Sequence, residues 1–220
     1  MILRITQYGE PILRQRGARI PALTPEIEAL ITDMFDTMEA ANGIGLAAQQ
    51  IGHALQLAVL DVRPAAPDRP STLTLNGAPA DPAVLMPMVL INPVVTPIGK
   101  PVLGPEGCLS FPEIFADIAR AESVEVSALN AKFEPIKFQC GGLLARAVQH
   151  EADHLQGIVF IDRMTAAKKA ELQEELDILH SETRLAMKGR HKPKTPKFYS
   201  FLFIPRLNFS NAETPRRRKS

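Results

Sequence analysis

The sequence predicts an α+β domain in which mostly antiparallel sheets pack around a central helix, with one further helix near each end of the chain. Three observations predict this class. Strand-like runs follow one another in series, some with the period-two alternation of half-buried strands. Segments of helical periodicity flank these runs instead of alternating with them, which argues against repeated βαβ units. The chain has 220 residues, 45% of them hydrophobic, which is enough for one core and short for two.

The N-terminal helix is predicted to begin after Thr24. Thr24, Pro25 and Glu26 are the residue types preferred at an N-cap, at the first helical position and in an acidic first turn. Apolar side chains then recur at helical spacing, at Ile27, Leu30, Ile31, Met34 and Met38. Asn42 and Gly43 are predicted to end the helix.

Strands are predicted at residues 56–61, 88–92, 123–129 and 132–139, and together they favour a mostly antiparallel sheet. Residues 63–88 separate the first two runs and are rich in Pro, Ala and Asp. We expect this segment to be an inserted loop or an irregular hairpin, and we assign it no chemistry.

The central helix is predicted in the run LLARAVQHEADHLQG, which follows two glycines at 141–142. Leu143, Ala147 and His150 fall at helical spacing, and Gly157 offers a C-terminal stop. A last helix is predicted over roughly 165–187. Its leucines gather on one side and its charges on the other, which is typical of a helix packed on a surface. The leucines are Leu172, Leu176 and Leu179.

Beyond the last helix the composition changes. Residues 188–220 hold ten Lys or Arg and one acidic residue, although the whole chain has a formal net charge of +1. A basic tail favours a polyanionic partner, and a merely solvated tail is an equal alternative. Residues 198–209 are apolar, and could dock on the domain, dock on a neighbouring chain or remain an extension. We therefore expect one catalytic domain, residues 1–187, followed by a basic, flexible extension, residues 188–220.

Composition also indicates the compartment. No run approaches the roughly 18 apolar residues of a membrane span, and the N-terminus lacks the layout of a secretory signal. The two cysteines, Cys108 and Cys140, are too few for a disulfide framework and are typical of a reducing environment. We expect a cytoplasmic protein with free thiols and without a membrane partner.

The strongest chemical signal is the HExxH motif from His150 to His154. Residues i and i+4 of a helix share a face, so both imidazoles can reach one metal ion, while Glu151 can approach a water bound to it. The alternative is a charged helical surface with two incidental histidines. Apolar neighbours such as Ala147 and Leu155 predict a buried helix and so favour the metal site. The central helix is therefore predicted to bind a metal and to support hydrolysis.

A catalytic metal usually has a third protein ligand and one open position. Gly107 and Pro112 indicate a tight, irregular segment around Cys108 that could present a thiolate, whereas Cys140 ends a strand-like run and is more typical of a core thiol. These residues favour Cys108 without deciding for it. The candidates are Cys108, Cys140, His53, His180 and His191.

A third segment, GIGLAAQQIG at 43–52, follows the N-terminal helix. Its first two glycines would let a peptide backbone come close, and a following Gln could donate an amide N–H to a developing oxyanion. Because the segment does not follow a strand, a dinucleotide-binding loop is not predicted. Taken alone, the segment is more typical of an ordinary turn after a helix.

Together, the segments GIGLAAQQ, EGCLS and QHEADH, in that order, resemble the three signature segments of the peptide deformylase family, and RITQYGEPILR is similar to its N-terminal strand and turn. The resemblance extends from about Ile2 to about residue 187. It implies an α+β fold and one divalent metal ion, natively iron(II), for which zinc, nickel or cobalt can substitute. It also implies removal of the N-formyl group from formyl-methionine on new polypeptides, with release of formate.

The resemblance implies a role for six residues. A water bound to the metal would lose a proton to a general base, the hydroxide would attack the formyl carbon, and the same residue would then protonate the departing amine. Two further groups would donate hydrogen bonds to the oxyanion. Matched to the motifs, the metal ligands are Cys108, His150 and His154, the general base and acid is Glu151, and the oxyanion donors are Gln50 and the backbone N–H of Leu109.

By the same resemblance, an extended substrate would add a strand along residues Gly43, Ile44, Gly45 and Leu46. Its methionine side chain would enter an apolar pocket formed by Ile44, Leu143 and Ala147. These three are alternatively ordinary core residues, and for Leu143 the two interpretations weigh equally. Size exclusion at the metal would explain a preference for formyl over bulkier acyl groups.

The chain departs from the family pattern in places. Some bacterial members have an arginine where this chain has Phe115, and Arg120 is expected in the same loop, so the contacts that orient the substrate there are in question. The insert at 63–88 and the basic tail suggest a variant subgroup. Some relatives bind the ribosome through the C-terminal helix, which residues 165–187 and the tail could also do. The expected partners are formyl-methionyl nascent peptides and the ribosome, and not DNA.

Two other functions use the same residues. A zinc endopeptidase also has an HExxH helix, but the GCLS segment argues against it. A structural metal site or a ribosome-binding module without catalysis would need neither Glu151 nor Gln50.

Overall fold

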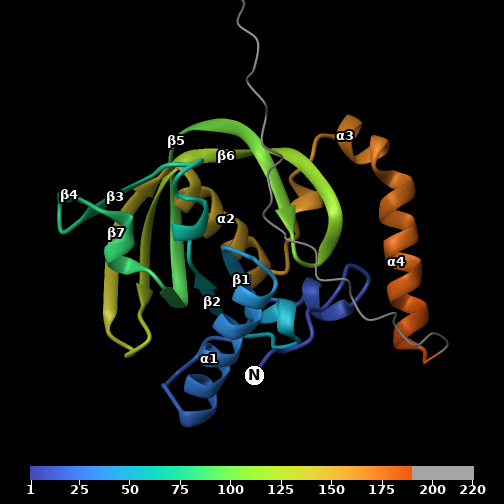
Figure 1. Ribbon diagram of the computed structural model, residues 1–220, viewed down its shortest axis with the longest axis horizontal. Helices are drawn as coiled ribbons and strands as arrows, with labels where there is room; N and C mark the ends of the chain where they lie inside the picture. The colour runs from blue at the N-terminus through green and yellow to red at the C-terminus, as the bar shows by residue number, and fades with distance from the viewer. Residues whose placement is uncertain (190–220) are drawn as a thin grey trace, which may run out of the picture.

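The computed structural model describes residues 1–189. His191, the segment 198–209 and nearly all of the expected extension lie outside the described residues. The strands form one sheet in the order β1-β2-β5-β6-β7-β3-β4, and every pair of neighbours is antiparallel (Figure 1). Because neighbouring strands are antiparallel and the helices do not alternate with parallel strands, the structure confirms the predicted α+β class. Within residues 1–189, no helix has the length and apolar character needed to cross a membrane.

The central helix α2 contacts strands β1, β2, β3, β5, β6 and β7. The strands are β1 (Gly45–Ala47), β2 (Leu57–Leu60), β3 (Ser71–Leu75), β4 (Ala78–Ala80), β5 (Met88–Cys108), β6 (Phe111–Leu129) and β7 (Pro135–Gly141). The helices are α1 (Pro25–Ala40), α2 (Gly142–Leu155), α3 (Ala166–Glu171) and α4 (Gln173–Met187). Short 3-10 helices include η1 (Pro11–Arg14), η2 (Ala48–Ile51) and η5 (Phe160–Asp162).

Helix α1 agrees with its prediction. Thr24 is the N-cap, its side chain accepts the Ile27 N–H at 3.4 Å, and Pro25 occupies the first helical position. The helix ends before Asn42, whose φ of 53° lies in the left-handed region. Its apolar stripe is buried, and the buried apolar members are Leu30, Ile31, Met34 and Met38.

Strand β2 lies between α1 and α2, which explains why all four of its residues are buried. Leu57 and Val59 belong to the core cluster that contains the apolar stripe of α1. Ala58 and Leu60 belong to the cluster that contains the apolar residues of α2. A strand covered on both faces has an uninterrupted apolar sequence. The two neighbours of β2 in the sheet, the edge strand β1 and the N-terminal end of β5, also lie close to α2.

The long strands β5 and β6 extend far beyond the predicted runs at 88–92 and 123–129. Beyond the predicted run, β5 contains four prolines, at 93, 97, 101 and 105, and proline is uncommon inside strands. Beyond Ile91, β5 pairs with β6 alone, and a strand paired on one side tolerates residues without an N–H. The segment around Cys108 is therefore the end of a strand, and Arg120 lies within β6, not in the loop where it was expected.

The insert at 63–88 contains a regular hairpin. Strands β3 and β4 are joined by Asn76 and Gly77, whose φ values of 52° and 79° are those of a two-residue hairpin turn. Strand β3 also pairs with β7, from Thr72↔Gly141 to Leu75↔Phe138. The hairpin therefore extends the main sheet beside the start of α2.

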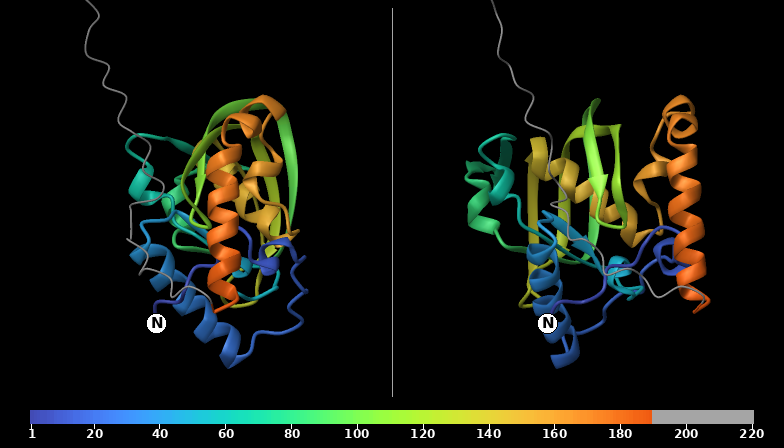
Figure 2. Two further views of the ribbon diagram at one scale, coloured as in Figure 1. Left: turned by 90° about the vertical axis from the view of Figure 1, so that its right-hand side faces the viewer. Right: turned by 45° about the vertical axis from the view of Figure 1, so that its right-hand side comes forward.

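The predicted C-terminal helix is wrong in one respect, because residues 166–187 form two helices with Leu172 between them. Leu176 of α4 is buried in a cluster with Leu13, Phe111 and Phe160. Two views show α4 at the opposite end of the domain from the β3–β4 hairpin (Figure 1, Figure 2). The helix thus packs on a surface, as its one-sided pattern indicated.

Candidate metal centre

Three ligand atoms converge where the end of β5 meets α2. One potential ligand atom each from Cys108, His150 and His154 lies within 4.8 Å of the other two. The Cys108 Sγ is 3.3 Å from the His154 Nε2, and the two imidazole rings have centroids 5.0 Å apart. One thiol and two imidazoles are suitable ligands for zinc or iron and leave a fourth position open. The group could therefore hold a metal ion.

The other candidates for a third ligand do not join this group. Cys140 lies in the core between β7 and its neighbours, and burial raises the pKa of its thiol to about 12. His53 is exposed, and His180 is exposed on α4 with its ring 5.4 Å from that of Tyr8. His191 lies outside the described residues.

Glu106 orients one of the two imidazoles. Its Oε2 lies 3.1 Å from the His150 Nδ1, so the Nε2 of that ring is left for the site. Arg120 and Arg146 donate to the same carboxylate at 2.8 to 3.0 Å. Burial raises the pKa of Glu106, but the hydrogen bonds from His150 and Arg120 outweigh it and lower the pKa overall. The buried carboxylate therefore stays ionised and can hold the ring in place.

A second acid completes this buried cluster. Arg120 also donates to Asp153 of α2, and Arg163 donates to the same carboxylate from the segment after η5. Arg120 is 5% exposed. It joins β5, β6 and α2 beneath the site, so the expectation that Arg120 lies in a substrate-orienting loop is wrong. Phe115, in turn, lies on β6 with its ring against Gly107.

Glu151 combines burial with an unused hydrogen-bonding atom. Its side chain is 4% exposed, and its Oε2 has no hydrogen-bond partner among residues 1–189. Burial raises the pKa of Glu151 to about 7, with His150 opposing the shift and Glu106 adding to it. A Cβ at position 45 would collide with this carboxylate, so Gly45 allows β1 to lie directly against it. A carboxyl group with a pKa near neutrality can both accept and release a proton.

Gln50 presents its amide to the same site from η2. The backbone N–H of Ala47 donates to its Oε1 at 2.8 Å, which fixes the amide plane. Its Nε2 lies 3.5 Å from the Cys108 Sγ and 3.4 Å from the Ser110 Oγ. The donor end of the amide therefore faces Cys108, one of the three potential ligands. Leu109, which follows Cys108, lines the same pocket.

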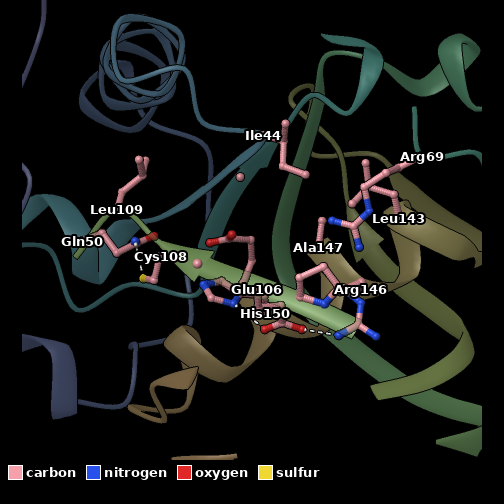
Figure 3. Close-up of a pocket in the computed structure, with 14 residues that line it drawn as sticks. Ile44, Gln50, Arg69, Glu106, Cys108, Leu109, Leu143, Arg146, Ala147 and His150 are labelled. Atoms are coloured by element: carbon pink, nitrogen blue, oxygen red, sulfur yellow. Dashed lines mark hydrogen bonds and ion pairs between the residues drawn. The ribbon is translucent and has the colours of Figure 1, made fainter. Parts of the chain in front are cut away.

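The pocket above this centre extends along α2 toward the insert (Figure 3). Ile44, Gly45, Leu143 and Ala147 line it, and Ile44, Leu143 and Ala147 are also buried members of the core cluster that contains α2. The side chain of Leu46 points instead into the core below β1. Because β1 is the outermost strand of the sheet, its free side is available to an extended peptide.

Comparison with known proteins identifies the family. The sequence matches the family described as Polypeptide deformylase over residues 2–170. The chain belongs to the peptide deformylase family. It is 43% identical over 190 residues to the peptide deformylase of Opitutus terrae, which covers 86% of this chain and 98% of the relative. It is 41% identical over 189 residues to that of Methylacidiphilum infernorum, with the same coverage, 86% and 98%.

Solved structures of peptide deformylases have the same fold. Arabidopsis thaliana peptide deformylase 1B, in complex with an inhibitor, has a TM-score of 0.72 and 35% identity and covers 87% of this chain and 97% of that chain. The enzyme from Synechococcus elongatus, in complex with actinonin, has a TM-score of 0.65 and 34% identity and covers 86% and 90%. The chain is therefore an enzyme, a hydrolase of protein biosynthesis, and not a module without catalysis.

Several residues that line this pocket or lie beside the candidate ligands were not predicted from the sequence. Glu106 and Ser110 flank Cys108 within the EGCLS segment, so their closeness to a candidate ligand was the available signal. Arg146 lies one turn before His150 on α2, so its position on the helix that carries the HExxH motif was the available signal for its place in the pocket. Arg69 gave no signal, because only the fold of the insert brings it to the pocket.

Proposed function

We propose that this chain removes the N-formyl group from the formyl-methionine of nascent polypeptides in the cytoplasm and releases formate. One observation carries the proposal. Beside the thiol and two imidazoles of Cys108, His150 and His154 lies the buried carboxyl group of Glu151, with one oxygen that has no partner within residues 1–189. Metal ligands and a free carboxyl group are the two components that amide hydrolysis by an HExxH helix requires.

Cys108, His150 and His154 would hold one divalent ion. The donor set fits the ion, since thiolate and imidazole ligands suit iron and zinc, and Glu106 already orients one imidazole. By its resemblance the native ion is iron(II), for which zinc, nickel or cobalt can substitute. When bound, the ion would lower the pKa of a water molecule and polarise the formyl carbonyl.

Glu151 would move the proton. Its carboxyl group would accept a proton from the attacking water and later deliver it to the departing amine, so it must be ionised at first and protonated afterwards. Its pKa of about 7, raised by burial, suits both tasks. The Gly45 backbone packs against the carboxyl group and limits where it can move.

Gln50 and Leu109 would stabilise the oxygen of the formyl group as it gains negative charge. The Gln50 Nε2 faces the site with its plane fixed by the Ala47 N–H. Leu109 would contribute its backbone N–H. In comparable sites, each such donor is worth up to roughly 3 kcal/mol.

The substrate would bind in an extended conformation along the free side of β1, from Gly43 to Leu46. Its first side chain would then enter the pocket lined by Ile44, Leu143 and Ala147. The closely packed ligands and Glu151 leave little room at the carbonyl, which favours the formyl group over larger acyl groups.

The decisive experiment uses anaerobically purified protein. Metal content and formate release from a short formyl-methionyl peptide would be measured for wild type, Glu151→Ala and the exposed-residue control Glu174→Ala. We expect Glu151→Ala to keep its metal and lose nearly all activity, whereas Glu174→Ala stays at the wild-type rate. Undiminished turnover in Glu151→Ala would remove this residue from the mechanism. Cleavage of internal bonds in an unformylated protein, without formate, would favour an endopeptidase.

Ribosome binding is a second part of the proposal. The exposed side of α4 carries Glu174, Asp177 and Glu182, which repel RNA phosphates. The ten basic residues of 188–220 would therefore supply the attraction, and it would weaken steeply with salt. Deletion of 188–220 should abolish co-sedimentation with ribosomes at low salt. Unchanged co-sedimentation would exclude a role for these residues.

A further inference from the structure

The insert brings a cation into the pocket that the first substrate side chain would occupy. Arg69 comes immediately before β3 and lines the pocket together with Ile44 and Leu143. Its guanidinium points toward Ala147 and Arg146, on the side of the pocket away from Gln50 and Cys108 (Figure 3). A guanidinium group therefore lies beside the apolar side chains of Ile44, Leu143 and Ala147 in this pocket.

The backbone beside Arg69 is held in place, so this position does not depend on a loose loop. The carbonyl of Pro70 accepts the N–H of Leu143 at 3.3 Å, and the Ser71 hydroxyl accepts the N–H of Leu144 at 3.0 Å. Both donors belong to the first turn of α2, where backbone N–H groups have no partner within the helix. The hairpin and the helix thereby fix the starting point of the Arg69 side chain.

The guanidinium of Arg69 has hydrogen-bonding capacity left over. Its Nη1 is buried and has no partner among the residues that the structure describes. Glu106 is the carboxylate whose negative charge acts on Arg69, and it is already bonded to His150, Arg120 and Arg146. Burial, and after it the charge of Arg146, lowers the pKa of Arg69, yet an arginine stays protonated in proteins. A positive donor group thus faces the cavity.

Arg146, in contrast, is bonded to several acceptors of the protein. Its guanidinium donates to Glu106 and to the backbone carbonyls of Val102, Gly104 and Ile118 at 2.8 to 3.2 Å. These bonds hold α2 against β5 and β6. Of the two guanidinium groups in the pocket, only that of Arg69 has a buried nitrogen without a partner among residues 1–189.

Successive side chains of an extended peptide point to opposite faces, so a peptide along β1 places its first side chain in this pocket and its second outside. We propose that Arg69 selects a first side chain that ends in a hydrogen-bond acceptor. This inference rests on the proposed function. Norleucine has the shape of methionine without an acceptor, the methionine thioether is a weak acceptor, and the oxygen of methionine sulfoxide is a strong one. The chain therefore deformylates formyl-methionine sulfoxide peptides in preference to formyl-norleucine peptides.

The test compares three peptides, formyl-Met-Ala-Ser and its norleucine and methionine sulfoxide analogues, in competition in one tube. Wild type should favour the sulfoxide over norleucine by about tenfold in kcat/KM, because a hydrogen bond from a charged donor is worth at least that factor. Arg69→Leu should remove this preference, and Arg69→Lys should keep part of it. Arg63→Leu, which changes an exposed arginine of the same insert bonded to Asp61, should leave the ratio unchanged. The ratio is internal to each sample, so partial unfolding of a variant does not alter it.

A binding measurement separates this inference from the proposed function. Calorimetry with Glu151→Ala would compare the affinities of the sulfoxide and norleucine peptides without turnover, alone and combined with Arg69→Leu. Loss of the affinity ratio in the double variant supports the role of Arg69 even if no formate is released. An equal ratio with and without Arg69, in binding or in turnover, overturns it. Absence of formate release from formyl-Met-Ala-Ser contradicts the proposed function instead.

Discussion

The two cysteines show how tertiary position decides the chemistry of one residue type. Cys108 and Cys140 are both free and both buried. Cys108 ends β5 beside two imidazoles, whereas Cys140 lies within β7 among aliphatic side chains. Burial without a compensating charge raises the pKa of Cys140 to about 12, which makes it a poor nucleophile and a poor ligand. Only Cys108 is placed to bind an ion.

Serine substitutions should separate these two environments. Cys108→Ser should reduce bound metal by at least about tenfold, because a hydroxyl is a much weaker ligand than a thiolate for iron or zinc. Cys140→Ser should keep its metal and instead lower the free energy of unfolding by roughly 1–3 kcal/mol, the cost of burying an unpaired hydroxyl. Metal analysis and urea denaturation of both variants check these outcomes. Equal metal content in Cys108→Ser and wild type would contradict its place among the ligands.

Residue patterns were informative where the chemistry was local in sequence. His150 and His154 lie one helical turn apart, so helical periodicity alone could pair them. Glu106 is 44 residues from His150, and only the antiparallel register of β5 and β6 over α2 brings it to the ring. The position of Arg69 is harder still to predict from the sequence, because it depends on the insert folding back onto α2. Such contacts leave no periodic signal in a single sequence.

At the scale of elements, the long antiparallel pair β5–β6 was the least predictable part of the sheet, because prolines interrupt the strand pattern of β5. Strands β5 and β6 pair from Ile91↔Leu129 to Cys108↔Phe111, yet the sequence predicted only their outer ends. The register is interrupted between Ile98 and Pro101, which is a bulge that a simple alternation pattern does not anticipate. The helices were easier to predict, because their caps and apolar stripes are local. The site nevertheless depends on the strands, since β5 delivers both Glu106 and Cys108.

The buried ion cluster is predicted to be the strongest connection between these strands and α2. Arg120→Met should lower the free energy of unfolding by about 3–5 kcal/mol, because it leaves the buried Glu106 and Asp153 carboxylates short of a positive partner. Chemical denaturation followed by circular dichroism measures this loss. A reduced affinity for metal should accompany it, since Glu106 orients His150.

The matched control is an ion pair of the same sheet that is exposed. Lys137 of β7 lies 3.2 Å from Glu125 of β6, and the two side chains are 66% and 46% exposed. Lys137→Met should change the free energy of unfolding by less than about 1 kcal/mol, because water screens such pairs. Similar losses in both variants would mean that burial is not what makes the Arg120 cluster strong.

At the scale of the whole molecule, the two ends of the domain have different tasks. The segment before the β3–β4 hairpin supplies Arg69 to the pocket, while α4 covers the core cluster around Phe160 at the opposite end of the domain from this hairpin (Figure 2). That cluster draws Leu13, Phe111, Phe160 and Leu176 from four separate parts of the chain. The C-terminal helix therefore belongs to the folded domain, which the sequence predicted to end at residue 187.

Two truncations test where the folded domain ends. A chain that stops after Gly189 should keep the wild-type Tm, and its formate release should stay within about twofold, because it retains every core cluster that the structure describes in residues 1–189. A chain that stops after Leu172 removes the buried Leu176 side chain and the contact of His180 with Tyr8. It should lose about 2–5 kcal/mol, as for the deletion of a buried leucine. Each kcal/mol corresponds to roughly 2–4 °C in a domain of this size, so calorimetry should show a Tm lower by at least about 4 °C. An equal drop in Tm after both truncations would place part of the folded core in residues 190–220.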